Sequence, residues 1–127
     1  MPHPIFMYSA LGMGLILGGF GLNGSFRPDA HLVALGFPAH TDPKAQKLNY
    51  ALMRIWGIRN IAVSALVTLI WSTGNERLMA QALCAVLPIP IVDGFVSRAL
   101  IGGGEGQHWS FPPVMVVVIA GLFGFFD

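Results

Sequence analysis

Charged residues are scarce in this chain, and their scarcity excludes several classes of protein. Asp, Glu, Lys and Arg make up 10% of the 127 residues, whereas an ordinary soluble domain carries roughly 25%. Seven Lys and Arg balance six Asp and Glu, so the net charge is +1 and there is no basic stripe for nucleic acid. Because 54% of the residues are hydrophobic, the chain can neither cover a water-facing surface with polar groups nor stay disordered. We expect lipid as the main partner and no nucleic acid.

Cysteine pairs, metal-ligand clusters and a P-loop are also missing. Cys84 is the only cysteine, so no disulfide can form within the chain, and no Cys/His cluster points to zinc or iron–sulfur. His3, His31 and His40 have no ligand-spaced carboxylate or histidine nearby, so we expect no metal site. A P-loop is absent as well. The length allows one domain, over residues 1–127, and we expect it to use no cofactor.

Long apolar runs are what the sequence has in abundance. A helix needs about 17–25 mainly apolar residues to cross the hydrocarbon core of a bilayer. Four segments meet this requirement, and a long loop over 23–48 joins the first two; the segments are 5–22, 49–71, 78–101 and 107–126. We therefore predict an all-α fold, a polytopic membrane four-helix bundle. Small residues in the first segment should let a neighbouring helix approach closely; they are Gly12, Gly14, Gly18, Gly19 and Gly21.

Four spans place both termini on one side of the membrane and the first and third loops on the other. The basic residues of those two loops are Arg27, Lys44, Lys47 and Arg98, whereas the second connection holds only Arg77. Because cytoplasmic loops carry an excess of Lys and Arg, we expect an integral membrane protein with its first and third loops in the cytoplasm.

Ionisable side chains inside the apolar segments are the first candidates for a functional site, because such residues are costly in lipid. At a rise of about 1.5 Å per residue, Arg54 and Arg59 lie roughly 8 and 15 Å from the start of the second segment. Asp93 lies roughly 12 Å before the end of the third segment, and these two segment ends are at the same membrane face. Asn23 ends the first segment on that face, and His108 opens the fourth there. Chain connectivity thus gathers these groups in one half of the bundle.

Helical periodicity predicts which side chains share a face. One stripe of the second segment holds Asn49, Met53, Trp56, Asn60 and Val67. Arg59 lies beside this stripe, and Arg54 projects from the other flank of the helix. The third segment has a stripe of Val86, Pro90, Asp93 and Ser97. Pro88 and Pro90 each remove an N–H and free a carbonyl about four residues earlier, which predicts an interrupted helix just before Asp93. Irregular backbone at this depth is tolerated where it lines protein or a wet cavity. We expect a pocket between the second, third and fourth segments.

The order of short motifs along the chain resembles a known family. These motifs are Phe26-Arg27-Pro28, Gly57-Ile58-Arg59-Asn60, Asn75-Glu76-Arg77, Asp93-Gly94 and His108. Nearly the whole chain resembles small four-helix integral membrane proteins of bacteria and fungi, catalogued as a domain of unknown function and similar in architecture to DoxX-like proteins. Asn60 stands where the family more usually has Asp, which removes one carboxylate. The resemblance implies the fold, and some fungal relatives look like accessory enzymes of secondary-metabolite pathways that reshape polyketide or terpenoid intermediates.

The residue set suits acid/base chemistry on an uncharged lipophilic substrate without a cofactor. We expect Asp93, Arg59 and His108 to be catalytic, with Asp93 as general acid or base, Arg59 orienting it and His108 exchanging protons with solvent. The expected substrate-binding residues are Asn60, Trp56, Arg54 and Asn23. The reactions that fit are epoxide opening, by water or by an internal hydroxyl to close a ring, and double-bond isomerisation.

Two other functions stay open at this point. Asp93 and Arg59 or Arg54 can form a structural ion pair in a non-catalytic scaffold subunit, since pairing is how such charges survive in lipid. Alternatively, Asp93 can move protons or solutes in a small carrier, which with four short helices would have to be a homo-oligomer. A closed pocket that joins Asp93, Arg59 and His108 favours the enzyme, a dry ion pair favours the scaffold, and a continuous polar path favours transport.

Overall fold

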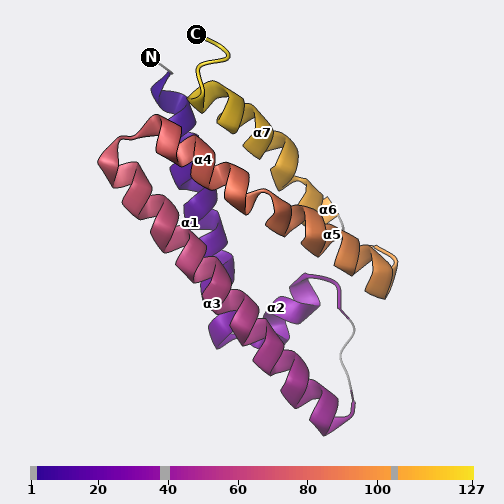
Figure 1. The fold of residues 1–127 in the computed structure, drawn as a ribbon. Coiled ribbons are helices and arrows are strands. Elements are labelled where there is room, and N and C mark those ends of the chain that lie inside the picture. Colours follow the sequence, from indigo (N-terminus) through magenta and orange to yellow (C-terminus); the bar gives the residue numbers. More distant parts are fainter. Residues whose placement is uncertain (1–2, 38–40, 104–105) are drawn as a thin grey trace.

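The chain folds into packed helices, seen in a computed structural model that describes residues 3–37, 41–103 and 106–127. The described residues contain no strand, and both termini lie at the same end of the molecule (Figure 1). The helices are α1 (Pro4–Phe26), α2 (Pro28–Ala34), α3 (Pro43–Thr73), α4 (Glu76–Val86), α5 (Pro88–Ile101), α6 (Gly106–Trp109) and α7 (Phe111–Leu122).

The first three predicted spans are confirmed as helices. The first corresponds to α1 and the second to α3, which begins at Pro43 with the Asp42 side chain accepting a hydrogen bond of 3.1 Å from the Lys44 N–H. The third is divided into α4 and α5 at Leu87, just before Pro88. Proline lacks an N–H and crowds the carbonyl four residues earlier, so the regular hydrogen bonding stops there. This is the predicted interruption before Asp93.

Two predicted boundaries were wrong. The segment 23–48 is not a continuous loop, because α1 runs to Phe26 and α2 follows from Pro28. The fourth segment, 107–126, is divided at Ser110 and its helix ends at Leu122. Two consecutive prolines, at 112 and 113, lack the N–H groups that would continue α6 into α7. Gly124 has a φ of +87°, so the chain turns after α7 instead of continuing as a helix.

Small residues let α1 and α3 pack closely, as predicted, although not all of the expected glycines take part. A Cβ on Gly21 would lie 2.6 Å from the Gly57 carbonyl oxygen, and one on Gly14 would lie 2.7 Å from the Val67 side chain. Gly12 and Gly19 have open space where a Cβ would lie. The α1–α3 contact therefore uses one stripe of α1.

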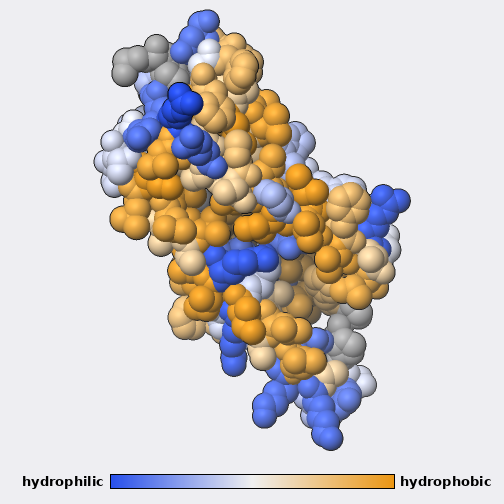
Figure 2. All heavy atoms as spheres, viewed as in Figure 1, coloured by the Kyte–Doolittle hydropathy of each residue, from blue (hydrophilic) through white to orange (hydrophobic). Residues whose placement is uncertain are grey.

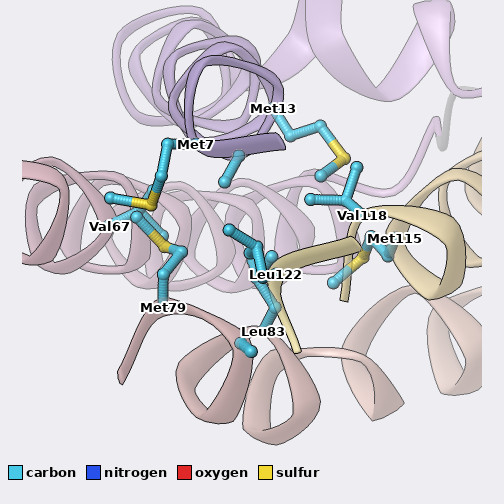
Figure 3. Packing of buried hydrophobic residues seen from close by; sticks show 10 residues of the cluster. Met7, Met13, Val67, Met79, Leu83, Met115, Val118 and Leu122 are labelled. Carbon is cyan, nitrogen blue, oxygen red and sulfur yellow. The ribbon is translucent and has the colours of Figure 1, made fainter. Parts of the chain in front are cut away.

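A methionine-rich core joins four of the helices at one end of the bundle. Met7 and Met13 of α1 point toward Met79 of α4 and toward Met115 and Leu122 of α7 (Figure 3). Met79 is fully buried. Flexible thioether side chains fill the irregular space between helices of different tilt, and this core holds α7 against α1 and α4.

The face seen in Figure 2 is strongly apolar, with hydrophilic side chains near the ends of the molecule and in a small patch at its middle. Large side chains such as Ile58 (60%), Leu66 (59%) and Val116 (52%) are exposed on several helices. An apolar surface this extensive has lipid as its natural solvent. Three helical segments are long and apolar enough to cross a membrane, namely Pro4–Phe26, Pro43–Thr73 and Glu76–Ile101, and α7 is a shorter apolar helix. The chain is a polytopic helical membrane protein.

Candidate functional site

Two cavities lie between the helices. The inner cavity, of about 480 Å³, is lined by mainly apolar side chains of α1, α3, α4 and α7. The outer cavity, of about 560 Å³, lies toward the beginning of α3 and the end of α5. Each volume is within the range of small-molecule sites in proteins. Four residues line both cavities, and these are Leu35, Trp56, Asp93 and His108.

Asp93 comes to this junction from α5 and is bound to α3. Its Oδ2 accepts a hydrogen bond from Nη2 of Arg59 at 3.0 Å, and the two groups form an ion pair. The side chain of Asp93 is 24% exposed and that of Arg59 is 40% exposed. Arg59 does not line either cavity, so it holds the carboxylate from outside the space that a ligand could occupy. The sequence predicted either Arg59 or Arg54 as the ion-pair partner of Asp93, and the partner is Arg59.

His108 comes to the same junction from α6, outside the three candidate spans. Burial lowers its pKa below the ordinary value, the Asp93 carboxylate acts in the opposite direction, and the Arg59 guanidinium lowers the pKa further. The neutral ring is thus favoured, while the influence of Asp93 and Arg59 shows that the three groups act on one another. A residue whose pKa is perturbed by burial and by a specific charge partner, at the wall of a cavity, is a functional candidate.

The position of His108 depends on its neighbour Trp109. The Trp109 indole lies directly against Gly94, where a Cβ would overlap its ring. Its Nε1 donates a hydrogen bond of 3.1 Å to the Ile91 carbonyl oxygen. Its ring packs edge-on against that of Phe95, with 5.0 Å between the ring centroids. The Asp93-Gly94 pair therefore places the carboxylate and also provides the surface on which α6 docks.

The second helix of the site, α3, contributes Trp56 and Asn60 as predicted by their stripe. Asn60 is 3% exposed and lines the inner cavity, while Trp56 lies at the junction of the two cavities. The other three members of the stripe also line a cavity: Asn49 and Met53 the outer one and Val67 the inner one. The pocket predicted between the second, third and fourth segments is present as the inner cavity.

His31 is a cavity residue that the sequence analysis missed. It is 4% exposed, and α2 brings it to the wall of the inner cavity, where its ring lies 4.9 Å from that of Trp56. Its Nδ1 is 2.6 Å from Nδ2 of Asn23, and its buried Nε2 has no hydrogen-bond partner among the described residues. Burial lowers its pKa, so the neutral ring is favoured. The only sequence signal was a histidine three residues after Pro28, at the start of a short apolar stretch.

Comparison with known proteins places the chain in a family. Residues 14–122 match the family described as a domain of unknown function (DUF4267). The chain belongs to this family. No curated protein and no solved structure matches it.

The match confirms the coarser part of the resemblance, an uncharacterised family of this kind. All the predicted site residues lie inside the DUF4267 match. Three of them do not line either cavity: Arg59 holds Asp93 from outside the cavities, Arg54 is exposed on α3, and Asn23 acts through its hydrogen bond to His31. Within the described residues, no group of three or more His, Cys, Asp and Glu could hold a metal ion. His40 is outside the described residues.

Proposed function

We propose that this DUF4267 protein is a cofactor-independent membrane enzyme that performs acid/base chemistry on a lipophilic substrate. One observation carries the proposal: Asp93 and His108 meet at the junction of two otherwise mainly apolar cavities. A mostly apolar pocket with a few convergent polar groups and a perturbed pKa is the expected form of a small-molecule active site.

The reaction that fits these groups best is the opening of an epoxide, by water or by a hydroxyl of the same substrate. The Asp93 carboxylate accepts the proton of the attacking oxygen while that oxygen forms a bond to an epoxide carbon. The carbon–oxygen bond of the epoxide breaks, and the released oxygen takes a proton from His108, which reacts in its less populated protonated form. Asp93 then returns its proton to His108. Because burial lowers the pKa of His108, its protonated form is the stronger acid.

The same two groups can move a proton from one carbon to another, which isomerises a double bond. Neither reaction consumes an external oxidant or reductant. In both, Arg59 acts as a positioning residue that holds one carboxylate oxygen at 3.0 Å, and the buried Asn60 amide binds a substrate oxygen. Trp56 provides apolar surface beside the reacting atoms.

The biological setting belongs to the same proposal. We place the enzyme in secondary metabolism, on a polyketide or terpenoid intermediate dissolved in the bilayer, as the family resemblance implies. With the first and third connections in the cytoplasm, as their Arg and Lys residues predict, the Asp93–His108 end of the bundle faces the cytoplasmic leaflet.

The test is a metabolite comparison by mass spectrometry between cells that carry the wild-type chain and cells that carry Asp93→Asn. The amide keeps the shape of the carboxylate but cannot accept the proton. We expect an epoxide or uncyclised precursor to accumulate only with the variant. Identical metabolite profiles would refute the proposal and favour the scaffold.

A matched control separates loss of chemistry from loss of folding. Arg54→Gln also removes a charge from the same half of the bundle, but Arg54 is exposed and lines neither cavity. Its metabolite profile should equal that of the wild type. Both variants must reach the membrane at the wild-type level, and failure of Asp93→Asn to do so would indicate a structural charge.

A further inference from the structure

The two cavities follow one axis, and the order of residues along α3 shows it. The lining residues Leu52 and Met53 belong to the outer cavity, Trp56 belongs to both, and Val63 and Val67 belong to the inner cavity. From the first lining residue, Asn49, to the last, Val67, the helix rises about 27 Å at about 1.5 Å per residue.

The helices α4 and α5 give the same order independently. Leu83 and Ile89 line the inner cavity, Asp93 lines both, and Val96 and Ile101 line the outer cavity. The path from Leu83 to Ile101 is again about 27 Å long. On α3 and on α5, the residue shared by both cavities lies between the two sets, so Asp93 and His108 stand between two adjoining cavities that follow one line.

The two ends of this line of cavities are mainly apolar, with Asn49 as the polar residue of α3 at the outer end. Val67 and Leu83 line the inner end and are almost completely buried. At the outer end, Leu52 (54%), Val96 (48%) and Leu100 (70%) are exposed on the lipid-facing surface as well as lining the cavity. A molecule dissolved in the bilayer can therefore reach the outer cavity without crossing water.

We propose that the substrate is an elongated lipophilic molecule that fills both cavities at once and carries an uncharged oxygen function in the middle of its chain, beside Asp93 and His108. This inference rests on the proposed function for the reaction and adds the class of substrate. An oxygen function at one end of the chain would leave one cavity empty when it lies beside His108.

Two isomeric probes test this arrangement without knowledge of the substrate. One is the symmetric dialkyl ketone with two eight-carbon arms, and the other is its isomer with the carbonyl at the second carbon. The two isomers contain the same atoms, and the partition of each into the micelles is measured separately, so that the remaining difference in affinity reports the fit. Binding is measured from the ring signals of His108 in protein labelled with nitrogen-15 histidine, in detergent micelles. We expect the symmetric ketone to bind at least about threefold more tightly, the contribution of one hydrogen bond.

Three matched variants assign the two arms to the two cavities. Val63→Trp fills part of the inner cavity and Val96→Trp fills part of the outer one, whereas Val92 lines neither, so Val92→Trp is the control. Each of the first two variants should reduce the affinity ratio of the two isomers to about one, and the control should leave the ratio unchanged. The inference is refuted if the isomers bind equally to the wild type, or if only one of the two cavity variants changes the ratio.

Failure of this inference and failure of the proposed function are distinguishable. Asp93→Asn should keep the preference for the symmetric ketone, because the probes are bound and not converted. A preference in the absence of any metabolite change would leave an elongated binding site without the proposed chemistry. A metabolite change without the preference would leave the enzyme and overturn the elongated substrate.

Discussion

The docking of α6 on α5 should depend on the absence of a side chain at position 94. In Gly94→Ala, the new Cβ would overlap the Trp109 indole, so Trp109 must leave its place. The variant loses the hydrogen bond from Nε1 to Ile91, worth about 0.5–1.5 kcal/mol, and the edge-on pair with Phe95, worth about 0.5–1.5 kcal/mol. The loss at Trp109 is therefore about 1–3 kcal/mol of the free energy of unfolding, before the gain that alanine brings to the helix.

A second glycine variant isolates this contribution. Alanine also favours a helix over glycine by about 1 kcal/mol, and Gly12→Ala gains that amount on α1 with open space around the Cβ. The difference between the two variants is therefore the loss at Trp109. It is measured by unfolding in mixed micelles, together with the indole N–H signal of Trp109. Equal stability of the two variants with an unmoved Trp109 signal would refute the reasoning.

The other predictions concern helix packing, a buried histidine and the ion pair. Gly57→Ala should destabilise the bundle by about 1–3 kcal/mol in the same unfolding assay, because a Cβ there meets α1, whereas Gly19→Ala should not; equal effects would contradict close α1–α3 packing. Burial lowers the pKa of His31 from its ordinary value of 6.5, so the unfolded chain binds the proton more readily and stability should fall as the pH drops below about 6.5. His31→Asn should weaken this dependence, measured by unfolding at several pH values, and an unchanged slope would contradict a buried neutral ring. Arg59→Met should destabilise the bundle by about 1–3 kcal/mol, because the Asp93 carboxylate loses its partner within an apolar span, and should lower turnover through misplacement of Asp93, while Arg54→Met should leave turnover unchanged; wild-type turnover in Arg59→Met would remove its positioning role.

Much of the site follows from periodicity and chain connectivity. The stripe of α3 from Asn49 to Val67 was predicted by a repeat of three and four residues, and its members line the two cavities. Pro88 predicted the division between α4 and α5, because a missing N–H has the same effect in any helix. The partner of Asp93 was predicted only as one of two arginines, and the helix face decides for Arg59.

The rest depends on tertiary packing that no local pattern reports. His31 is a cavity residue only because α2 folds back across α1 and α3, and a short helix in a connection gives no sign of this. Gly12 and Gly19 resemble Gly14 and Gly21 in sequence, yet they lie on the face of α1 away from α3. The role of Gly94 likewise requires Trp109, which is distant along the chain and comes from α6.

Conversion of a lipophilic substrate by Asp93 and His108, at the junction of the two cavities, can be tested directly. The most direct measurement incubates purified protein in nanodiscs with a lipid extract from cells that carry Asp93→Asn, in water enriched in oxygen-18 and deuterium, and follows the products by mass spectrometry. We expect the wild-type protein, and not Asp93→Asn, to consume one precursor. Oxygen-18 in the product would identify opening by water, deuterium on carbon would identify isomerisation, and a rearranged product with neither would identify internal ring closure. No consumption by the wild type, or equal consumption by the variant, would contradict this conversion.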